Sequence, residues 1–271
     1  MTLRRVLPGR LVLLGHPVAH SLSPRFQNAA LREARIATRY EALDVLPDAL
    51  PAVLDALVAE GAGGNVTIPH KAAVAARCAR RTPVAERAGA VNTFWVEDGA
   101  LVGDNTDVAG VEAAVVRLLG RAPAGERVAL LGAGGSAAAV LCAVERWGGA
   151  SASIYNRTMT HAHSLAARFP GVATAAPSAH AALADATLVV NATSVGLDGA
   201  SLPVPIAALP PGIPVLDLVY APGETAWVRA ARAAGHPAQD GLVMLVEQGA
   251  AAFERWFGVP PSRAAMWSAL R

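Results

Sequence analysis

The stretch that decides the fold reads VALLGAGGSA and covers residues 128–137. A short apolar run typical of a strand leads into a glycine-rich turn, and an alanine-rich helical pattern follows. Gly132 allows a tight turn, Gly134 lets the backbone approach a pyrophosphate, and Ala137 permits close packing of helix on strand. The first amides of the helix and its positive dipole end favour phosphate binding. We therefore predict a Rossmann-type dinucleotide site, the alternative being a glycine turn that serves packing alone.

The end of the next predicted strand, at 152–155, indicates which dinucleotide binds. An NAD site usually places Asp or Glu there to bind the ribose hydroxyls. This strand ends in Tyr155-Asn156-Arg157-Thr158, with no carboxylate. The Arg157 guanidinium and the Thr158 hydroxyl suit a 2′-phosphate, through charge-assisted hydrogen bonds worth roughly 1.5–3 kcal/mol. The sequence therefore predicts NADP rather than NAD.

Length and composition limit the class of protein. A chain of 271 residues favours two domains, and 53% hydrophobic with 16% charged residues excludes global disorder. The net charge of +2, from 23 basic and 21 acidic residues, argues against a nucleic-acid or membrane-surface binder. No apolar run reaches the roughly 18 residues that span a bilayer.

Targeting and redox signals favour the cytoplasm. The N-terminal region lacks the apolar run and cleavage site of a secretory signal. Cys78 and Cys142 lie far apart in alanine-rich helical patterns. This arrangement predicts buried thiols in a reducing compartment and offers no metal-ligand spacing.

Strand and helix patterns alternate in both halves of the chain, which predicts an α/β fold class. The first half shows strands at 10–14, 40–45 and 64–68, helices from Pro24, at 47–60 and at 71–81, and a hairpin of 90–96 with 99–102 about the turn Glu97-Asp98. The second half shows a helix at 107–119, a Gly/Pro/Arg linker at 120–126, strands at 128–131, 152–155, 187–191 and 215–218, and helices from the glycine turn to Trp147 and from Gly241 onward. The linker and the segment before Gly241 are candidate hinges.

Lysine is used once in this chain. Of the 23 basic residues, 22 are arginine, and the remaining one is Lys71. Arginine is effectively always charged, whereas the environment can tune the pKa of a lysine amine. A solitary lysine therefore suggests proton transfer at position 71, with chance as the alternative.

The scarce polar residues gather in a few short segments. The two hydroxyls of HSLSP at 20–24 suit a carboxylate, although a Ser-Pro helix cap is the simpler explanation. NVTIPHK at 65–71 alternates Asn and Thr on one face of a strand end. Asn92-Thr93 ends another strand, Asn105-Thr106-Asp107 precedes a helix, where Asp107 alone is typical of a cap, and Gln248 lies in the last helix. Together they indicate a site for a polyhydroxylated acid.

These segments resemble the shikimate dehydrogenase family along almost the whole chain. The matching motifs occur in the family's order and spacing: HSLSP at 20–24, NVTIPHK at 65–71, AVNT at 90–93, NTD at 105–107, GAGGSA at 132–137, NRT at 156–158, NATS at 191–194 and GLVMLVEQ at 241–248. Eight motifs in order are highly specific, whereas any one of them is weak.

The resemblance implies two domains and a reaction. An N-terminal α/β substrate domain would cover 1–106, with the C-terminal helices of 241–271 returning to it, and a Rossmann-type doubly wound NADP domain would cover 107–240. The implied reaction is the reversible NADPH-dependent reduction of 3-dehydroshikimate to shikimate, in chorismate and aromatic amino acid biosynthesis. Lys71 and Asp107 would be the catalytic pair.

The resemblance also supplies a set of binding residues. The expected substrate-binding residues are Ser21, Ser23, Asn65, Thr67, Lys71, Asn92, Asp107, Tyr220 and Gln248. The expected cofactor-binding residues are Gly132, Ala133, Gly134, Gly135, Ser136, Ala137, Asn156, Arg157, Thr158, Thr193, Leu218 and Gly241. We expect no metal, nucleic acid or membrane partner, and a monomer or homodimer.

One departure and three alternatives remain. Position 161 is His161, where the family often has a second basic residue for the 2′-phosphate, so the preference for NADP is expected to be weaker or pH-sensitive. The nearest alternative is a quinate or aminoshikimate dehydrogenase of the same superfamily. A glutamyl-tRNA reductase-like protein would need a nucleophilic cysteine near its start and a longer chain. A non-catalytic NADP-binding regulator is disfavoured by the intact Lys71 and Asp107.

Overall fold

The computed structural model describes residues 9–271 and forms two compact α/β units. Unit 1 contains the chain up to Gly110 together with Leu245–Arg271, and unit 2 contains Val111–Met244. Both divisions fall inside helices, a few residues after the boundaries that we expected at 106 and 240.

Unit 1 is built on a mixed six-stranded sheet with the order β2-β1-β3-β5-β6-β4. Strand β1 pairs in parallel with β2 and β3, whereas β5 runs antiparallel to both β3 and β6. The strands are β1 (Leu11–Gly15), β2 (Tyr40–Asp44), β3 (Gly63–Val66), β4 (Arg80–Arg81), β5 (Thr93–Glu97) and β6 (Ala100–Asp104).

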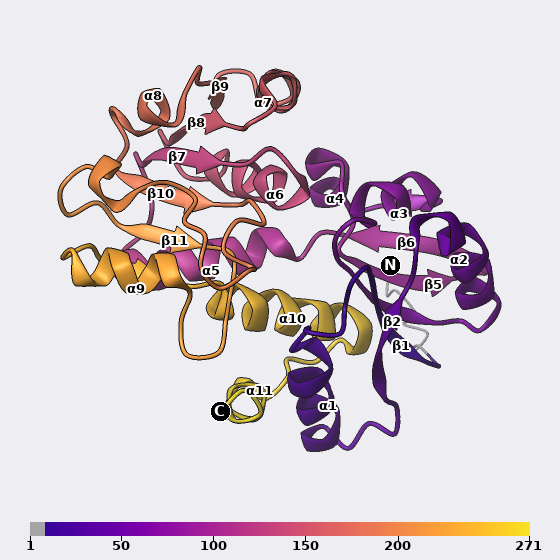
Figure 1. Cartoon of the computed structure of the whole chain (residues 1–271). Coiled ribbons are helices and arrows are strands. Elements are labelled where there is room, and N and C mark those ends of the chain that lie inside the picture. The colour runs from indigo at the N-terminus through magenta and orange to yellow at the C-terminus, as the bar shows by residue number, and fades with distance from the viewer. Residues whose placement is uncertain (1–8) are drawn as a thin grey trace. The chain divides into compact units, whose positions relative to one another are not determined.

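Helices cover both faces of this sheet because side chains alternate along each strand. Val12 and Leu14 of β1 belong to one core cluster, which contains apolar residues of α2 and α3. Leu11 and Leu13 belong to the other, with residues of α1, α10 and α11. The helices, labelled where there is room in Figure 1, are α1 (Ser23–Glu33), the 3₁₀ turn η1 (Pro47–Ala49), α2 (Leu50–Ala59), α3 (Lys71–Arg77), α4 (Pro83–Ala88), α10 (Leu242–Phe257) and α11 (Arg263–Ser268).

The helix predicted at 71–81 is wrong in its second half. Helix α3 ends at Arg77, and Arg80–Arg81 forms β4, which pairs in parallel with β6. Thr82 then accepts a hydrogen bond from the amide of Ala85 and caps α4, which we did not predict. Alanine-rich composition favoured one long helix, whereas pairing with β6 and the Thr-Pro start signal divide the segment.

The predicted hairpin is shifted in register. Its strands are Thr93–Glu97 and Ala100–Asp104, so the turn is Asp98-Gly99 rather than Glu97-Asp98. Both turn residues have positive φ, 53° for Asp98 and 72° for Gly99. Two such residues match the twist of the flanking strands, and Asp-Gly is a favoured pair for this turn.

Unit 2 contains an all-parallel sheet with the order β12-β11-β10-β7-β8-β9. The strand order reverses between β7 and β10, as in a doubly wound fold, so the predicted fold class is confirmed. Its strands are β7 (Arg127–Leu131), β8 (Ser151–Tyr155), β9 (Ala173–Ala175), β10 (Leu188–Asn191), β11 (Val215–Asp217) and β12 (Ala238–Gln239).

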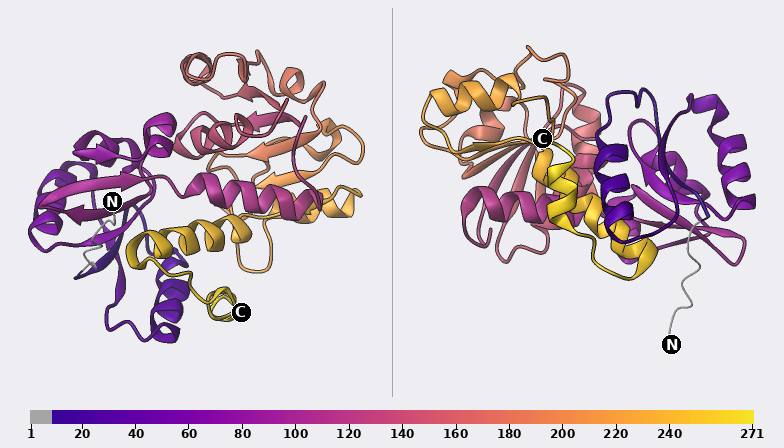
Figure 2. Two further views of the ribbon diagram at one scale, coloured as in Figure 1. Left: turned by 180° about the vertical axis from the view of Figure 1, so that it is seen from behind. Right: turned by 90° about the horizontal axis from the view of Figure 1, so that it is seen from below.

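Helices also flank the sheet of unit 2. Apolar residues of α8, η2 and α9 pack against β7, β10 and β11 in one cluster. Figure 2 shows α9 and α5 on opposite sides of these strands. The helices are α5 (Asp107–Leu119), α6 (Gly135–Val144), α7 (Met159–Ala167), α8 (Ala179–Leu183), η2 (Ile206–Ala208) and α9 (Ala226–Ala233).

The linker predicted at 120–126 does not connect the two units. It lies inside unit 2, where it joins α5 to β7. The amide of Gly125 donates to the carbonyl of Gly148 at 2.8 Å, and Arg121 forms an ion pair with Glu126. The prediction that this segment is a hinge between the units is therefore wrong.

Both cysteines are buried, which leads to a test of their reactivity. Cys78 is 8% and Cys142 is 4% exposed, and burial raises the pKa of the Cys78 thiol to about 11. The thiolate is the reactive form, so at pH 8 the native protein should react slowly with an aromatic disulfide reagent. In denaturant two thiols per chain should react at once, and one equally fast thiol in the native protein would contradict this burial.

Candidate functional site

The polar segments of unit 1 meet at one edge of its sheet. Parallel strands β1 and β3 end side by side, with Leu14 opposite Val66. Strand β6 ends at the same edge, where β5 begins, with Asp104 opposite Thr93. The chain therefore brings the segments that follow β1, β3 and β6 to one place, although they are far apart in sequence.

Lys71 and Asp107 form an ion pair at this edge. The Lys71 Nζ lies 2.6 Å from Asp107 Oδ2, and the other carboxylate oxygen accepts from Asn92 Nδ2 at 2.8 Å. Taken alone, Asp107 is typical of a helix cap, but its side chain accepts from Lys71 and Asn92. Its backbone amide donates to Asn105 Oδ1 at 3.1 Å, so Asn105 serves the helix start and the Asp107 side chain remains available to Lys71.

Asn92 is the centre of a buried network. Its Nδ2 lies within hydrogen-bond distance of three acceptors: Thr106 Oγ1 at 3.0 Å, Asp107 Oδ1 at 2.8 Å and Gln248 Oε1 at 3.1 Å. Its Oδ1 accepts from the amide of Thr106 at 2.7 Å. An amide nitrogen carries only two hydrogens, so the three acceptors share them. The predicted residues Asn92, Asp107 and Gln248 are thus brought together.

Asn65 is oriented by Tyr40, which the sequence analysis missed. Its Nδ2 donates to the carbonyl of Asn92 at 3.1 Å and to Thr93 Oγ1 at 2.9 Å, and its Oδ1 accepts from the Tyr40 hydroxyl at 2.8 Å. Both hydrogens of Asn65 are committed, so a further ligand finds an acceptor there. Tyr40 is 1% exposed, and in the sequence it looked like a core aromatic residue of a strand.

The two serines and Thr67 lie outside this network among the described residues. Ser21 Oγ accepts from the amide of Ser23 at 3.2 Å. Leu22 makes no side-chain capping bond to α1, so the first amide of this helix is met by Ser21 instead. Thr67 follows β3, and its amide donates to the carbonyl of Leu14 at 2.8 Å. Thr67 therefore lies beside the end of β1, whereas the two serines lie at the start of α1.

In the glycine turn of unit 2, three positions differ in their backbone conformation and in what surrounds them. Gly132 has φ +110°, and a Cβ there would lie 2.9 Å from the backbone of Ala192. Gly134 has φ −92°, and a Cβ there would meet nothing within 4 Å. Ala137, in the first turn of α6, is fully buried. The first glycine is thus required by the fold, whereas the second leaves the helix start open on a side where a pyrophosphate fits.

The end of β8 fits a 2′-phosphate. Asn156 Nδ2 donates to the carbonyl of Thr158 at 2.9 Å, which shapes the turn. Arg157 and Thr158 are exposed, and Thr158 precedes α7 without a side-chain capping bond. A guanidinium and a hydroxyl are therefore presented to solvent beside a helix start, with His161 exposed one turn further on.

The remaining predicted cofactor residues lie near the ends of β10 and β11. Thr193 Oγ1 donates to Asn191 Oδ1 at 2.6 Å, the amide of Leu218 donates to the carbonyl of Asn191 at 2.9 Å, and the amide of Gly241 donates to the carbonyl of Val219 at 2.9 Å. These residues and Tyr220 belong to unit 2. Lys71 and Asp107 belong to unit 1, so the predicted site residues come from both units.

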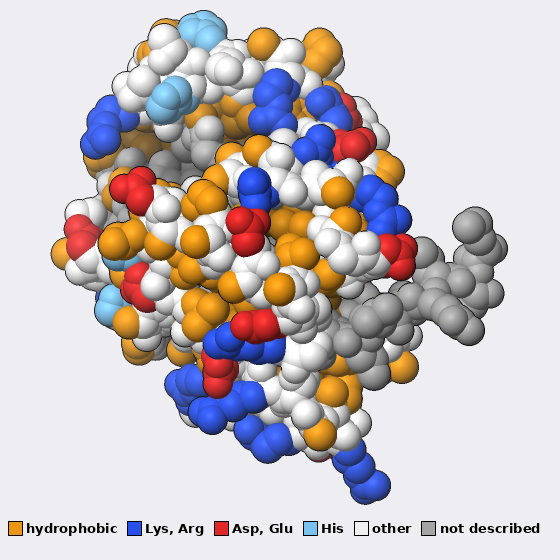
Figure 3. Space-filling view, turned by 90° about the vertical axis from the view of Figure 1, so that its right-hand side faces the viewer, with side chains coloured by type: hydrophobic (Ala, Val, Ile, Leu, Met, Phe, Trp, Pro, Cys, Tyr) orange, Lys and Arg blue, Asp and Glu red, His pale blue; other side chains and the backbone are white. Residues whose placement is uncertain are grey.

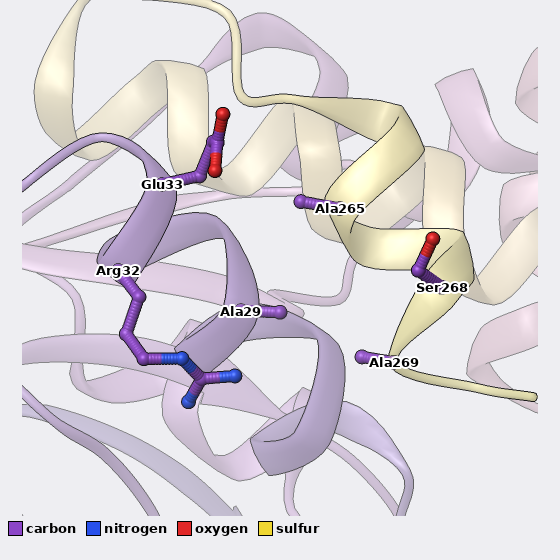
Figure 4. A pocket seen from close by; sticks show the side chains of 6 residues that line it. All are labelled: Ala29, Arg32, Glu33, Ala265, Ser268 and Ala269. Carbon is purple, nitrogen blue, oxygen red and sulfur yellow. The ribbon is translucent and has the colours of Figure 1, made fainter.

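A pocket of about 430 Å³ lies elsewhere in unit 1, between α1 and α11. Figure 4 shows the side chains of Arg32 and Glu33 projecting from α1 beside small residues of α11. None of the predicted site residues lines it. We therefore place the candidate site at the sheet edges rather than in this pocket.

A glycine-rich turn that opens a helix of a doubly wound unit, and a lysine–carboxylate ion pair in the other unit, are features expected of a dinucleotide-dependent oxidoreductase. Two family models match the chain: the shikimate dehydrogenase substrate binding domain at residues 13–94, and the shikimate 5′-dehydrogenase C-terminal domain at residues 241–271.

Similar proteins agree over almost the full length. A shikimate dehydrogenase (NADP(+)) of Mesorhizobium japonicum is 45% identical and covers 94% of this chain and 93% of its own. The shikimate 5-dehydrogenase of Thermus thermophilus, solved with NADP(H) and shikimate, is 40% identical with a TM-score of 0.87, covering 97% and 98%. The quinate dehydrogenase of Corynebacterium glutamicum, solved with NAD, is 30% identical with a TM-score of 0.84, covering 96% and 97%. The chain belongs to the shikimate dehydrogenase family, which confirms the resemblance seen in the sequence.

The contrast between the two glycines can be tested. Gly134→Ala should raise the Kd for NADPH about tenfold or more, because the added methyl occupies the approach to the pyrophosphate. Its Tm without cofactor should change by no more than about 3 °C, since the cost is that of a poorer helix cap. Gly132→Ala should lower Tm further, because its φ is +110° and the backbone of Ala192 is close. Binding is measured by NADPH fluorescence. An unchanged Kd for Gly134→Ala would show that the pyrophosphate does not approach the backbone at Gly134.

Proposed function

We propose that this chain catalyses the reversible NADPH-dependent reduction of 3-dehydroshikimate to shikimate, a step of chorismate and aromatic amino acid biosynthesis. The observation that carries the proposal is the ion pair of Lys71 with Asp107, 2.6 Å long, inside a network of buried amides and hydroxyls. A relative that is 40% identical over nearly its whole length holds NADP(H) and shikimate, which supports both ligands.

Lys71 is the proton carrier in this proposal. NADPH, when bound, supplies the hydride to the ring ketone, and the developing alkoxide then needs a proton. Both oxygens of Asp107 already accept N–H donors, from Lys71 and from Asn92, so this carboxylate is arranged as an acceptor. The lysine ammonium has three hydrogens and commits one to Asp107. It can therefore donate another to the alkoxide, and its neutral amine acts as base in the reverse direction.

The other polar residues fit the hydroxyls and carboxylate of the substrate. Ser21 and Ser23 would bind the carboxylate. Asn65 has one oxygen lone pair left, so it would accept from a ring hydroxyl rather than donate. Thr67, Asn92 and Gln248 would complete the contacts, and Tyr220 is the remaining residue that the family resemblance assigns to the substrate.

NADP is favoured over NAD by the end of β8. Arg157 and Thr158 would hold the 2′-phosphate, and β8 ends without a carboxylate for the ribose hydroxyls. The remaining cofactor contacts would come from Ala133, Gly135, Ser136 and Asn156 near the two helix starts, and from Thr193, Leu218 and Gly241.

Quinate oxidation is a second candidate, favoured by the quinate dehydrogenase that is 30% identical to this chain. A substrate panel distinguishes the two activities. Nicotinamide absorbance should rise with shikimate and NADP together, and kcat/KM should be higher for shikimate than for quinate and for NADP than for NAD. A higher value for quinate or for NAD would reverse that assignment, and no turnover with either substrate would favour a non-catalytic regulator.

The partners and location that we propose are simple. We expect a cytoplasmic monomer or homodimer that acts on a small molecule. No helix within residues 9–271 has the length and apolar character needed to cross a membrane. On the face drawn in Figure 3, acidic side chains stand among the basic ones, which does not favour a nucleic-acid surface.

Variants of Lys71 can show whether its proton or only its positive charge is needed for turnover. Lys71→Ala should lower kcat at least about a hundredfold and leave KM for shikimate nearly unchanged. Lys71→Arg should lose a similar factor, because a guanidinium keeps the charge but does not release its proton. Arg77→Ala, which breaks the exposed ion pair with Asp55 at the other end of α3, is the control and should retain activity. A variant of Lys71 that raises only KM would make this residue a binding group.

A further inference from the structure

Asp217 is a buried carboxylate that none of the proposed catalytic steps uses. It ends β11 in unit 2 and is fully buried. Its Oδ1 accepts from Asn191 Nδ2 at 2.8 Å and from the amide of Val219 at 3.1 Å, and its Oδ2 accepts from Thr225 Oγ1 at 2.8 Å. One side chain thus joins the end of β10, the segment after β11 and the start of α9.

The bond to Asn191 fixes the loop that carries Thr193. Asn191 Oδ1 accepts both the amide of Thr193 at 3.0 Å and its hydroxyl at 2.6 Å. The amide group of Asn191 can make these bonds only while its nitrogen points the other way, toward Asp217. The same nitrogen also donates to the carbonyl of Val195 at 3.2 Å. Asp217 accepts the shorter of these two bonds, so it helps to set the orientation of Asn191 and, through it, the position of Thr193.

The bond to Val219 fixes the neighbouring segment. The amide of Leu218 donates to the carbonyl of Asn191, and the amide of Gly241 donates to the carbonyl of Val219, both at 2.9 Å. A Cβ at Gly241 would lie 2.3 Å from the carbonyl oxygen of Leu218, so the backbone segments that contain Gly241 and Leu218 are in direct contact. The three predicted cofactor positions near the ends of β10 and β11, Thr193, Leu218 and Gly241, are thus linked to groups that Asp217 holds.

The site is built around the two acceptor oxygens of Asp217, on which three donors converge. Burial raises the pKa of Asp217, and the bonds from Thr225, Asn191 and Val219 oppose that effect. An ionised carboxylate accepts several donors and needs no acceptor of its own, whereas an amide or hydroxyl in its place adds a donor. Burying a charged group is costly, and its three donors here offset part of that cost.

We propose that Asp217 is a positioning residue for the nicotinamide half of the dinucleotide. In a doubly wound sheet each half binds one mononucleotide, and the 2′-phosphate side is at β8, so the ends of β10 and β11 face the other half. This proposal rests on the proposed function, because it concerns the same cofactor.

Three variants test the proposal. Asp217→Ala should raise the Kd for NADPH and KM for NADP about tenfold or more, with KM for shikimate within about twofold. Asp217→Asn keeps Oδ1 for Asn191 and Val219, and the Thr225 hydroxyl can accept from its new amide, so the Kd should stay within about threefold. Thr225→Ala removes the bond on the α9 side and a helix cap, so it should lower Tm while leaving the Kd within about threefold.

The readouts distinguish a positioning role from a structural one. Kd is measured by NADPH fluorescence without substrate, so it reports on Asp217 even if the wild-type protein fails to oxidise shikimate. A failure of the proposed function appears as absent turnover in the wild type, whereas a failure of this proposal appears in the variants. If Asp217→Ala and Thr225→Ala lower Tm alike and neither changes the Kd, Asp217 is only structural and the proposal is wrong.

Discussion

The pairing of Lys71 with Asp107 is the interaction on which unit 1 depends. A carboxylate loses hydration when it is buried, so the hydrogen-bonding positions of Asp107 have to be filled by donors from the protein. Asn92 Nδ2 donates to the second oxygen of Asp107, and the amide of Thr106 donates to the Oδ1 of Asn92. Gln248, in α10, accepts from the same Asn92 nitrogen. These links hold the ends of four segments at one sheet edge and leave the lysine amine with hydrogens to donate.

Unit 2 contains a second buried asparagine–aspartate hydrogen bond, and its aspartate has a different role. In both units an asparagine amide donates to the Oδ1 of a buried aspartate at 2.8 Å, Asn92 to Asp107 and Asn191 to Asp217. The partner of Asp107 is an ionisable lysine, so that carboxylate bears on proton transfer. The partners of Asp217 are a backbone amide and a threonine hydroxyl, so that carboxylate can only position its neighbours. Each aspartate's role therefore follows from its partners other than the asparagine: Lys71 for Asp107, and Val219 and Thr225 for Asp217.

Predictions from the sequence succeeded where short-range rules decide the outcome. The glycine turn, the helix that starts at Asp107 and the strand that ends at Tyr155 occur as expected, because each depends on a local pattern. The helix predicted across 71–81 failed because β4 exists only by pairing with β6, in which Arg80 lies opposite Val102 and Arg81 opposite Gly103. The linker at 120–126 failed for a similar reason, since its composition did not reveal that it packs inside unit 2.

The sequence by itself determined the family, the two α/β halves and the residue types available for the chemistry. The solitary lysine, the glycine turn and the absence of an acid after Tyr155 are all visible in the printed chain. Only the tertiary structure decided that Asn105 rather than Asp107 serves the helix start, that Tyr40 orients Asn65, and that Asp217 anchors Asn191. The physical reason is that a hydrogen bond between side chains depends on distance and direction in space, and sheet register creates both between residues that are remote in sequence.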